Sequence, residues 1–380
     1  MGQRKASSSK LSTPMIGKLG VSDSTICSRE QTGGNQLRRK KVCLGSRKME
    51  IGEAFKGYTL IHIVYTGIKS GILDLFAQRD NEHATAVEVA TQLDLDLCYV
   101  QIWFDACKAF GIAVSDSGSY RIASRYVAAI VDRNSPSYQG GLVEIFVDHL
   151  YTDMKTQAEL MRSGDRYLFS EHQTEFIDLI SKRGKLRARL FKDKFVETRP
   201  DVVEAFESNA VVCDIGCGTG TFLEAMNSFF PNPSYIGIDQ DEYSIGLCRS
   251  RLTNQGMKFF DRNIGDDPTL PEVDIFVMVL CLHEVEASSR LDFLRSCHDA
   301  LSSGGRMFIM EFPYPSTENE FQDPQFTMGI MDQFFEMTWG TQHMTLEEHR
   351  TILTKAGFSG IEINMLEDVP YMVVEAHKGE

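Results

Sequence analysis

The sequence lacks several features that would assign it to a common class of protein. No apolar run approaches the roughly 20 residues of a membrane-spanning helix, because the longest, Ile275 to Leu282, has eight. The nine cysteines are scattered and form no CxxC pair, which indicates reduced thiols rather than a disulfide framework. No apolar signal-peptide core is present. We therefore expect no membrane partner and a reducing compartment such as the cytoplasm.

The net charge of −14 argues against general phosphate binding, but this charge is unevenly distributed. Residues 1–48 carry eleven Lys and Arg side chains and two acidic ones, which gives +9. The remaining 332 residues carry 28 basic and 51 acidic side chains. The segment 1–48 lacks periodic apolar residues, so we expect a disordered basic tail. Its composition suits an organelle transit peptide, and the alternatives are a solvated leader or translation that begins at Met49.

Residues 49–135 predict several helices followed by a small hairpin. Apolar side chains recur at helical spacing over 58–75, Thr85 is placed to cap a second helix, and a third helix spans 100–110. Short strands on either side of a polar turn complete the order of a winged helix. The region has a charge of −4, and Lys108 is the only basic residue of its third helix. These charges argue against a nucleic-acid partner and favour a packing or dimerisation domain.

The rest of the chain divides into a helical region and an α/β region. Residues 136–205 predict long helices with aromatic and basic side chains, which would form a linker and part of a substrate pocket. From residue 206 to 380 the order strand, glycine turn, helix recurs. We expect this part to be a doubly wound α/β domain with a mostly parallel sheet.

The most informative segment joins a short apolar strand to a helix through three glycines. Gly216, Gly218 and Gly220 follow the strand, and glycine lets a backbone bend tightly and approach a ligand. The spacing is not the G-x-G-x-x-G of a dinucleotide site, because the third glycine position is Thr221. Asp214 precedes the turn, where a carboxylate would repel a pyrophosphate. It suits instead the ammonium and sulfonium groups of S-adenosylmethionine.

Two further acidic positions support this cofactor. Asp239 lies at the end of the next strand, where a carboxylate can accept both ribose hydroxyl hydrogens. Asp266 follows the third strand and is placed to bind the adenine amino group. The alternative is that both are only turn residues. The expected cofactor contacts are Asp214, Gly216, Cys217, Gly218, Gly220, Asp239, Gln240, Asp266 and Asp267.

In these motifs the chain resembles the class I S-adenosylmethionine-dependent methyltransferases. Residues 50–380 as a whole resemble the small-molecule O-methyltransferase family, whose members carry an N-terminal winged-helix dimerisation domain. The resemblance implies a Rossmann-like methyltransferase domain, S-adenosylmethionine as cofactor and a homodimer formed through the N-terminal domain. It also implies methyl transfer to a small aromatic molecule that bears a hydroxyl group.

The fourth strand, Val273 to Leu282, is expected to deliver His283 and Glu284 at its C-terminal end, where α/β sheets place their chemistry. The family resembled carries a catalytic His followed by an acid here, and a Glu that hydrogen-bonds this His. Glu311, 28 residues further on, matches that Glu. A His can remove a hydroxyl proton near neutral pH, because its reference pKa is about 6.5. No Asn/Asp-Pro-Pro-aromatic motif is present at this strand end, which weighs against a nucleobase substrate.

One position departs from the family pattern. A second orienting Glu is expected in a G-G-x-E-R-T-like stretch, and here 339–345 carries His343 instead. We expect His343 to join His283 and Glu311 in catalysis, as a neutral hydrogen-bond partner or a substrate contact. The alternative is a divalent metal held by His283, Glu284 and His343, since imidazole and carboxylate suit iron or zinc. This alternative resembles the α-keto acid C-methyltransferases, whose His pairs hold a metal that binds the keto acid. Loss of catalysis is a third interpretation.

Apolar side chains from two parts of the sequence are expected to enclose a flat substrate. The expected substrate contacts are Phe176, Met331, Phe334, Phe335 and Thr338. A helical stripe of Met and Phe is also typical of an ordinary core, which is the alternative for the segment 326–335.

Overall fold

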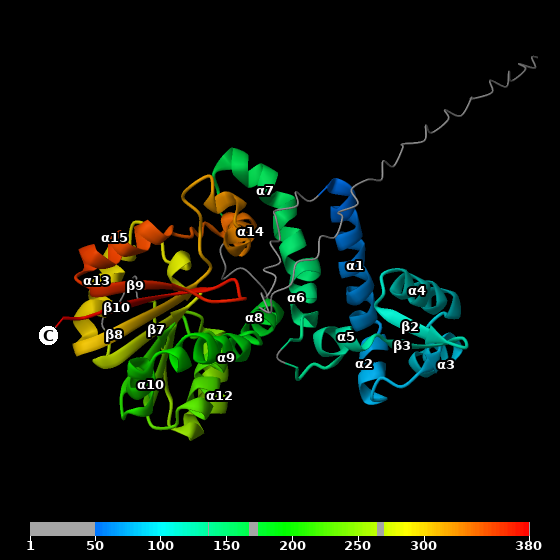
Figure 1. Ribbon diagram of the computed structural model, residues 1–380, viewed down its shortest axis with the longest axis horizontal. Helices are drawn as coiled ribbons and strands as arrows, with labels where there is room; N and C mark the ends of the chain where they lie inside the picture. The colour runs from blue at the N-terminus through cyan, green and yellow to red at the C-terminus, as the bar shows by residue number, and fades with distance from the viewer. Residues whose placement is uncertain (1–49, 136, 167–173, 264–269, 380) are drawn as a thin grey trace, which may run out of the picture. The chain divides into compact units, whose positions relative to one another are not determined.

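The computed structural model describes residues 50–135, 137–166, 174–263 and 270–379. Within these ranges the C-terminal half forms a seven-stranded sheet with helices on both faces (Figure 1). A region made mostly of helices precedes it. The predicted fold class is therefore confirmed: a doubly wound, mostly parallel α/β sheet after a mostly helical region.

The seven strands of the described ranges follow the order β6-β5-β4-β7-β8-β10-β9. The pairs from β6 to β8 are parallel, whereas β10 runs antiparallel to β8 and β9. The chain passes from β4 to β5 on one side and returns to β7 on the other, so β4 stands at the switch point where open sheets bind ligands. The strands are β4 (Val211–Ile215), β5 (Ser234–Asp239), β6 (Lys258–Asp261), β7 (Val273–Val279), β8 (Leu301–Glu311), β9 (Ser359–Met365) and β10 (Met372–His377).

Neighbouring side chains of each strand pack against different layers of helices. Val212 and Val277 join a cluster with α9 to α12, whereas Cys213 and Met278 join a cluster with α13 and α15. Successive residues of a strand point to opposite faces, so the apolar run of β7 is buried on both. The helices are α9 (Gly184–Lys194), α10 (Pro200–Glu207), α11 (Thr221–Phe229), α12 (Glu242–Leu252), α13 (Arg290–Ala300), α14 (Thr327–Glu336) and α15 (Leu346–Ala356), with short 3₁₀ turns at Val196–Thr198, Thr253–Gln255, Leu282–Glu284, Glu320–Gln322, Pro324–Phe326 and Met337–Trp339.

The N-terminal region contains the predicted helices and hairpin. Thr85 caps its helix as expected, in a capping box in which its hydroxyl accepts from Glu88 N and Glu88 accepts from Thr85 N. The two strands of the hairpin extend to Asp116 and resume at Ser119, so the turn between them is tight. The elements are α1 (Ile51–Lys69), α2 (Ile72–Gln78), β1 (Ala84–Thr85), α3 (Ala86–Leu93), α4 (Leu97–Ala109), β2 (Ala113–Asp116), β3 (Ser119–Ile122), α5 (Ser124–Tyr126) and a π-helical segment, Val127–Val131, and the three strands pair in the order β1-β3-β2.

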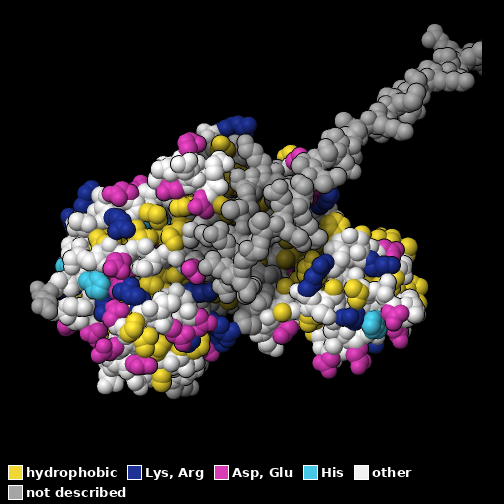
Figure 2. Space-filling view, viewed as in Figure 1, with side chains coloured by type: hydrophobic (Ala, Val, Ile, Leu, Met, Phe, Trp, Pro, Cys, Tyr) yellow, Lys and Arg dark blue, Asp and Glu magenta, His cyan; other side chains and the backbone are white. Residues whose placement is uncertain are grey.

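Several large apolar side chains of this region are exposed to solvent. Ile51, Phe55 and Tyr58, at helical spacing on α1, are 74%, 68% and 56% exposed, and Tyr99 and Ile102 of α4 are 78% and 60% exposed. Figure 2 shows apolar side chains gathered over α4. In the described part of the chain, no single helix is long and apolar enough to cross a membrane. Helices α1 and α2 together have that length and apolar character, but a bend of 64° separates them.

The predicted long helices of residues 136–205 are replaced by shorter elements. These are α6 (Gly140–Glu144), a π-helical segment (Ile145–Leu150), α7 (Tyr151–Ser163), α8 (Thr174–Ser181), and α9 and α10 as given above. Phe176 of α8 is fully buried in a cluster with Ile145, Leu150 and Trp339. This cluster therefore joins the helical region to the segment that carries His343.

The fourth strand is shorter than predicted. β7 ends at Val279, Leu280 adopts a left-handed φ of +53°, and a 3₁₀ turn carries Leu282–Glu284. The apolar run continues beyond the strand because the turn packs into the same core, where Leu282 is fully buried. The strand end still delivers His283 to the C-terminal edge of the sheet.

Candidate active site

The glycine turn lies at the C-terminal end of β4. Its backbone is tied to β5, because Gly216 N donates to the carbonyl of Ile238 (2.8 Å) and Gly218 N donates to Asp239 Oδ2 (2.7 Å). A Cβ on Gly216 would lie 2.4 Å from the sulfur of Cys281, so a larger residue would displace the turn. Gly218, at φ +51°, has open space where a Cβ would point. A ligand can therefore approach the backbone closely here.

A cavity of about 560 Å³ lies beside this turn. Three polar atoms on residues that line it have no hydrogen-bond partner among the described residues: Asp214 Oδ1, Thr219 Oγ1 and Arg187 Nε. Buried polar groups in proteins are normally satisfied. A cationic group would satisfy Asp214, and a carboxylate would satisfy Arg187. The lining therefore suits S-adenosylmethionine, which carries an ammonium, a sulfonium and a carboxylate.

The electrostatics of this cavity favour a cation. Asp214 is only 1% exposed, and burial together with the charge of Asp239 raises the pKa of its carboxyl well above the ordinary value. Burial also raises the pKa of Asp239, against the lowering effect of hydrogen bonds from backbone N–H groups that include those of Asp241 and Gly218. A bound positive charge would stabilise both carboxylates.

Most of the predicted cofactor contacts come together here. Asp214, Gly216, Cys217, Gly218, Asp239 and Gln240 line the cavity. Gly220 serves instead as the N-cap of α11, with φ +74°. Asp266 and Asp267 lie outside the described residues. Arg187 was missed by the sequence analysis, because nothing in the sequence of α9 distinguishes it from the neighbouring Lys and Arg residues.

His283 and Glu311 form a close pair at the edge of the sheet. The Nδ1 atom of His283 lies 2.6 Å from Glu311 Oε2, and Glu311 Oε1 accepts from the backbone N–H of Leu282 (3.0 Å). Both side chains are buried. Burial opposes ionisation of Glu311, but the charge and hydrogen bond of His283 outweigh it and lower the pKa of Glu311 to about 2. Glu311 is therefore a carboxylate, and Nδ1 of His283 carries the proton.

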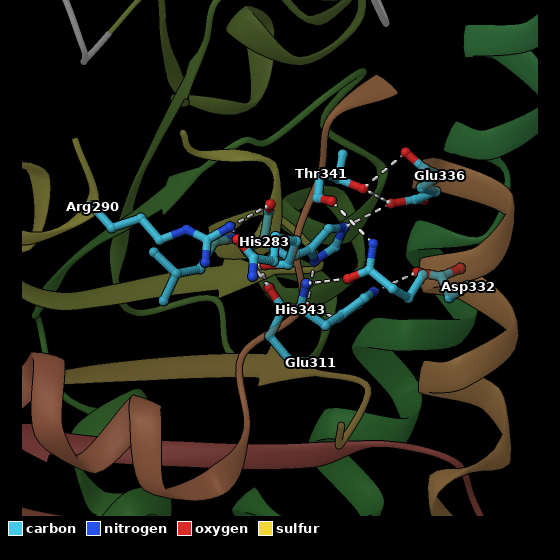
Figure 3. Close-up of polar contacts among 10 residues, drawn as sticks. His283, Arg290, Glu311, Asp332, Glu336, Thr341 and His343 are labelled. Carbon is cyan, nitrogen blue, oxygen red and sulfur yellow. Dashed lines mark hydrogen bonds and ion pairs between the residues drawn. The ribbon is translucent and has the colours of Figure 1, made fainter. Parts of the chain in front are cut away.

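His343 stacks against His283, with ring centroids 4.3 Å apart. Both rings also face carboxylates of α14: His283 Nε2 lies 3.3 Å from Glu336, and His343 Nε2 lies 2.9 Å from Asp332 (Figure 3). Burial lowers the pKa of His283, but Glu311 and Glu336 together raise it well above the ordinary value. The two carboxylates therefore favour the imidazolium form of His283.

Asp332 and Glu336 were not predicted as site residues from the sequence. They are spaced i, i+4, so they share one face of α14. We expected the Met and Phe side chains of this helix to face the site, yet Met331 is 40% and Phe334 is 54% exposed. The helix instead turns its polar face to the histidines. The i, i+4 pair of carboxylates in an apolar segment was the signal available in the sequence.

The other expected substrate contacts lie deeper. Phe176 and Thr338 are buried, and Phe335 packs edge-on against Phe146 with centroids 4.9 Å apart. Phe176 also packs against Trp339, at 5.8 Å. The aromatic side chains belong to one cluster with Trp339, which also lines the cofactor cavity.

The two histidines also belong to a group that could hold a metal ion. Ligand atoms of His283, Asp332, Glu336 and His343 all lie within 4.8 Å of one another. This set differs from the one predicted, because Glu284 lines the cofactor cavity and does not belong to it. Imidazole and carboxylate ligands suit iron or zinc. Glu311 contacts Nδ1 of His283, and a carboxylate on the other ring nitrogen commonly orients a histidine that binds a metal.

Comparisons with known proteins match the chain to O-methyltransferases. Residues 181–359 match the model of the O-methyltransferase domain family. The chain is 21% identical to phenazine O-methyltransferase of Lysobacter antibioticus, over 80% of this chain and 88% of that protein. It is 24% identical to 3-hydroxy-5-methyl-1-naphthoate 3-O-methyltransferase of Streptomyces sahachiroi, over 77% and 84% of the two chains.

The fold is likewise shared with a solved structure. Human N-acetylserotonin methyltransferase, solved in complex with S-adenosylmethionine, superposes with a TM-score of 0.71 at 16% identity, over 89% of this chain and all of that one. The family match covers the glycine turn, His283, Glu311 and His343. The chain is therefore a class I S-adenosylmethionine-dependent methyltransferase that carries an O-methyltransferase domain.

Proposed function

We propose that this enzyme transfers a methyl group to a hydroxyl oxygen of a small aromatic molecule, with His283 as the general base. The observation that carries this proposal is the His283–Glu311 pair, which is buried at the C-terminal edge of the sheet beside the cofactor cavity. General bases act by taking the proton of the attacking group, and an acidic partner on Nδ1 orients the ring for this role. The curated relatives named above are O-methyltransferases of phenazine and hydroxynaphthoate compounds, which supports an aromatic acceptor.

The chain would hold its cofactor through complementary charges. Asp214 would face the ammonium or sulfonium, Asp239 the ribose hydroxyls and Arg187 the carboxylate. When bound, S-adenosylmethionine supplies an electrophilic methyl group on its sulfonium. Phe176, Phe335 and Thr338 are the proposed acceptor contacts, because Phe176 and Phe335 pack with Trp339, which lines the cavity, and Thr338 precedes it.

The protonation of His283 decides when it can act. The ring lies between two carboxylates, Glu311 and Glu336, which favour its protonated form and raise its pKa above the ordinary value despite burial. It becomes a base when Nε2 loses its proton, and the acceptor hydroxyl would then take the place of Glu336 at that atom. His343, stacked beneath the ring, would limit its rotation.

The test is a screen with S-adenosylmethionine carrying a labelled methyl group and a panel of phenols, catechols, hydroxynaphthoates and hydroxyphenazines. We expect label in an ether product of at least one acceptor, and binding of S-adenosylhomocysteine by calorimetry. Cofactor binding without transfer to oxygen on any acceptor would contradict the proposed reaction while leaving the family assignment intact.

A second candidate function is metal-assisted C-methylation of an α-keto acid. The observation that favours it is the group of His283, Asp332, Glu336 and His343. A metal there would bind a keto acid and favour its enolate, and His283 would be a ligand rather than a base. Elemental analysis of protein purified without chelator, together with turnover in EDTA, decides between the two. A stoichiometric metal and inhibition by EDTA favour the second candidate, and the absence of both excludes it.

We also propose that the enzyme is a homodimer formed through residues 49–135, with 136–205 as the linker and substrate region and 206–380 as the methyltransferase domain. The exposed apolar side chains of α1 and α4 support a partner surface there, because monomeric soluble proteins rarely expose contiguous apolar patches of this kind.

A further inference from the structure

Arg290 is a buried arginine whose hydrogen bonds go to the protein backbone. It is 4% exposed, at the first position of α13. Its Nε donates to the carbonyl of Val285 at 2.7 Å, and its Nη2 donates to the carbonyls of His283 at 2.8 Å and Gln342 at 2.6 Å. One planar guanidinium therefore joins the 3₁₀ turn that carries His283 to the loop that carries His343 (Figure 3).

The two segments are distant in the sequence, and beyond the stacked rings they are joined through their backbones. A backbone hydrogen bond runs between them, from Gln342 N to His283 O at 3.1 Å. On its other side the loop is held by Gln333 of α14, whose Oε1 accepts from His343 N at 2.7 Å and whose Nε2 donates to Thr341 O at 3.0 Å. Side chains of α13 and α14 thus hydrogen-bond to the backbone of the loop from two sides.

Burying the guanidinium of Arg290 costs desolvation free energy. Burial lowers the pKa of Arg290, against the favourable charges of Glu311 and Glu348. A buried cation is tolerated when its hydrogen bonds are well made, and here they are made with the carbonyls that fix the catalytic rings. We propose that Arg290 is a positioning residue, which sets the stacked geometry of His283 and His343 by holding the carbonyls of His283 and of Gln342, the residue before His343.

This proposal rests on the proposed role of His283, so its test includes a measurement that needs no substrate. A short hydrogen bond between a buried imidazole and a carboxylate gives a low-field proton resonance, and the 2.6 Å pair of His283 and Glu311 is expected to show one. Glu311→Gln assigns the resonance by abolishing it. Arg290→Met should weaken or remove it as well, because the turn that carries His283 loses two of its anchors.

Measurements of kcat and of cofactor affinity then distinguish a loss of positioning from a general disruption of the fold. In Arg290→Met we expect kcat to fall about 10²-fold, as for a misplacement near 1 Å, while the affinity for S-adenosylhomocysteine stays within about twofold of wild type, well under the tenfold that 1.4 kcal/mol represents. Arg295→Met, on the exposed face of the same helix, is the matched control and should leave all three measurements unchanged.

If Arg290→Met does not fold, Arg290→Lys decides, because an ammonium keeps the charge but cannot span three carbonyls in fixed geometry. A folded Arg290→Lys with a weakened resonance supports the proposal. A folded variant, either Met or Lys, with the wild-type resonance overturns it. That result stands even if no acceptor is found, so failure of this proposal is distinguishable from failure of the proposed function.

Discussion

The imidazole of His343 lies flat against that of His283, with 4.3 Å between centroids and 24° between planes. Glu311 stands behind both rings, with Oε2 2.6 Å from Nδ1 of His283 and 4.0 Å from Nδ1 of His343. Two imidazoles therefore share one carboxylate on one side and face separate carboxylates of α14 on the other. This arrangement makes the behaviour of the site depend on pH and on each member of the cluster.

Replacement of His283 should remove the base and spare the cofactor site. For His283→Asn we expect kcat to fall about 10²–10⁴-fold, the usual contribution of a general base, with unchanged affinity for S-adenosylhomocysteine. His298→Gln, a histidine of α13 remote from the cofactor cavity, is the control. Turnover of His283→Asn at the wild-type rate would show that another group takes the proton.

The rate of methyl transfer should rise with pH above neutrality. Only the deprotonated ring can act as base, and the charges of Glu311 and Glu336 raise the pKa of His283 well above its ordinary value despite burial. Activity is therefore lost as pH falls through this raised pKa. Glu336→Gln removes one of these carboxylates and should shift the profile of kcat against pH toward lower pH. A profile that is flat from pH 6 to 9 in both proteins would contradict the assignment.

The His283–Glu311 pair should stabilise the fold most between about pH 4.5 and 6.5. The lowered pKa of Glu311, about 2, gives a contribution that is present above its unfolded pKa and is lost as pH falls toward 2. The raised pKa of His283 gives a contribution that is present below its unfolded pKa and is lost as pH rises through the folded value.

Urea denaturation of wild type and Glu311→Gln at acidic, intermediate and alkaline pH measures this window. The difference in free energy of unfolding should reach about 3 kcal/mol near pH 5.5, at about 1.4 kcal/mol per unit of pKa shift, and shrink on either side. A difference that does not change with pH would mean that the loss comes from packing alone.

Loss of the ribose acceptor should weaken the cofactor. For Asp239→Ala we expect the affinity for S-adenosylhomocysteine, measured by calorimetry, to fall at least about tenfold, which is 1.4 kcal/mol. The carboxylate also holds the turn through Gly218 N, so both effects act in the same direction. Asp292→Ala, 82% exposed on α13, is the matched control. Equal affinities for the two variants would remove Asp239 from the cofactor site.

A charge on the exposed face of α1 should dissociate the proposed homodimer. Phe55 is 68% exposed between Ile51 and Tyr58, and Phe55→Arg would place an unpaired cation at the centre of the surface. We expect a dimer in wild type and a monomer in Phe55→Arg by light scattering, with Lys56→Arg as the control. A monomeric wild-type protein would refute dimerisation.

Deletion of residues 1–48 should leave the chemistry unchanged. This basic segment lies outside the described residues and outside every motif of the site. The truncated protein should bind S-adenosylhomocysteine and turn over its acceptor as the full chain does. A loss of more than about tenfold in kcat/KM, or 1.4 kcal/mol, would assign the segment a direct part in the reaction.

The sequence predicts a functional residue when the same short segment shows both where that residue lies in the sheet and which chemical group it offers. The glycine turn directly follows β4, so Asp214 and Gly218 lie at the C-terminal edge of the sheet, where open α/β sheets bind their ligands. His283 follows β7 and Glu311 ends β8, and because these strands are parallel neighbours their C-terminal ends meet. The order of strands and helices alone therefore brought this pair together.

Only the tertiary structure decided which face of α14 meets the histidines and which residues hold them in place. Apolar periodicity shows that a helix has two faces but not which one a neighbouring loop will cover, so Asp332 and Glu336 could not be assigned. Arg290 acts on backbone carbonyls of two loops, and no pattern of residue types encodes that contact. Local order thus determined the cofactor turn and the base, whereas the packing of distant helices decided their charge environment and their geometry.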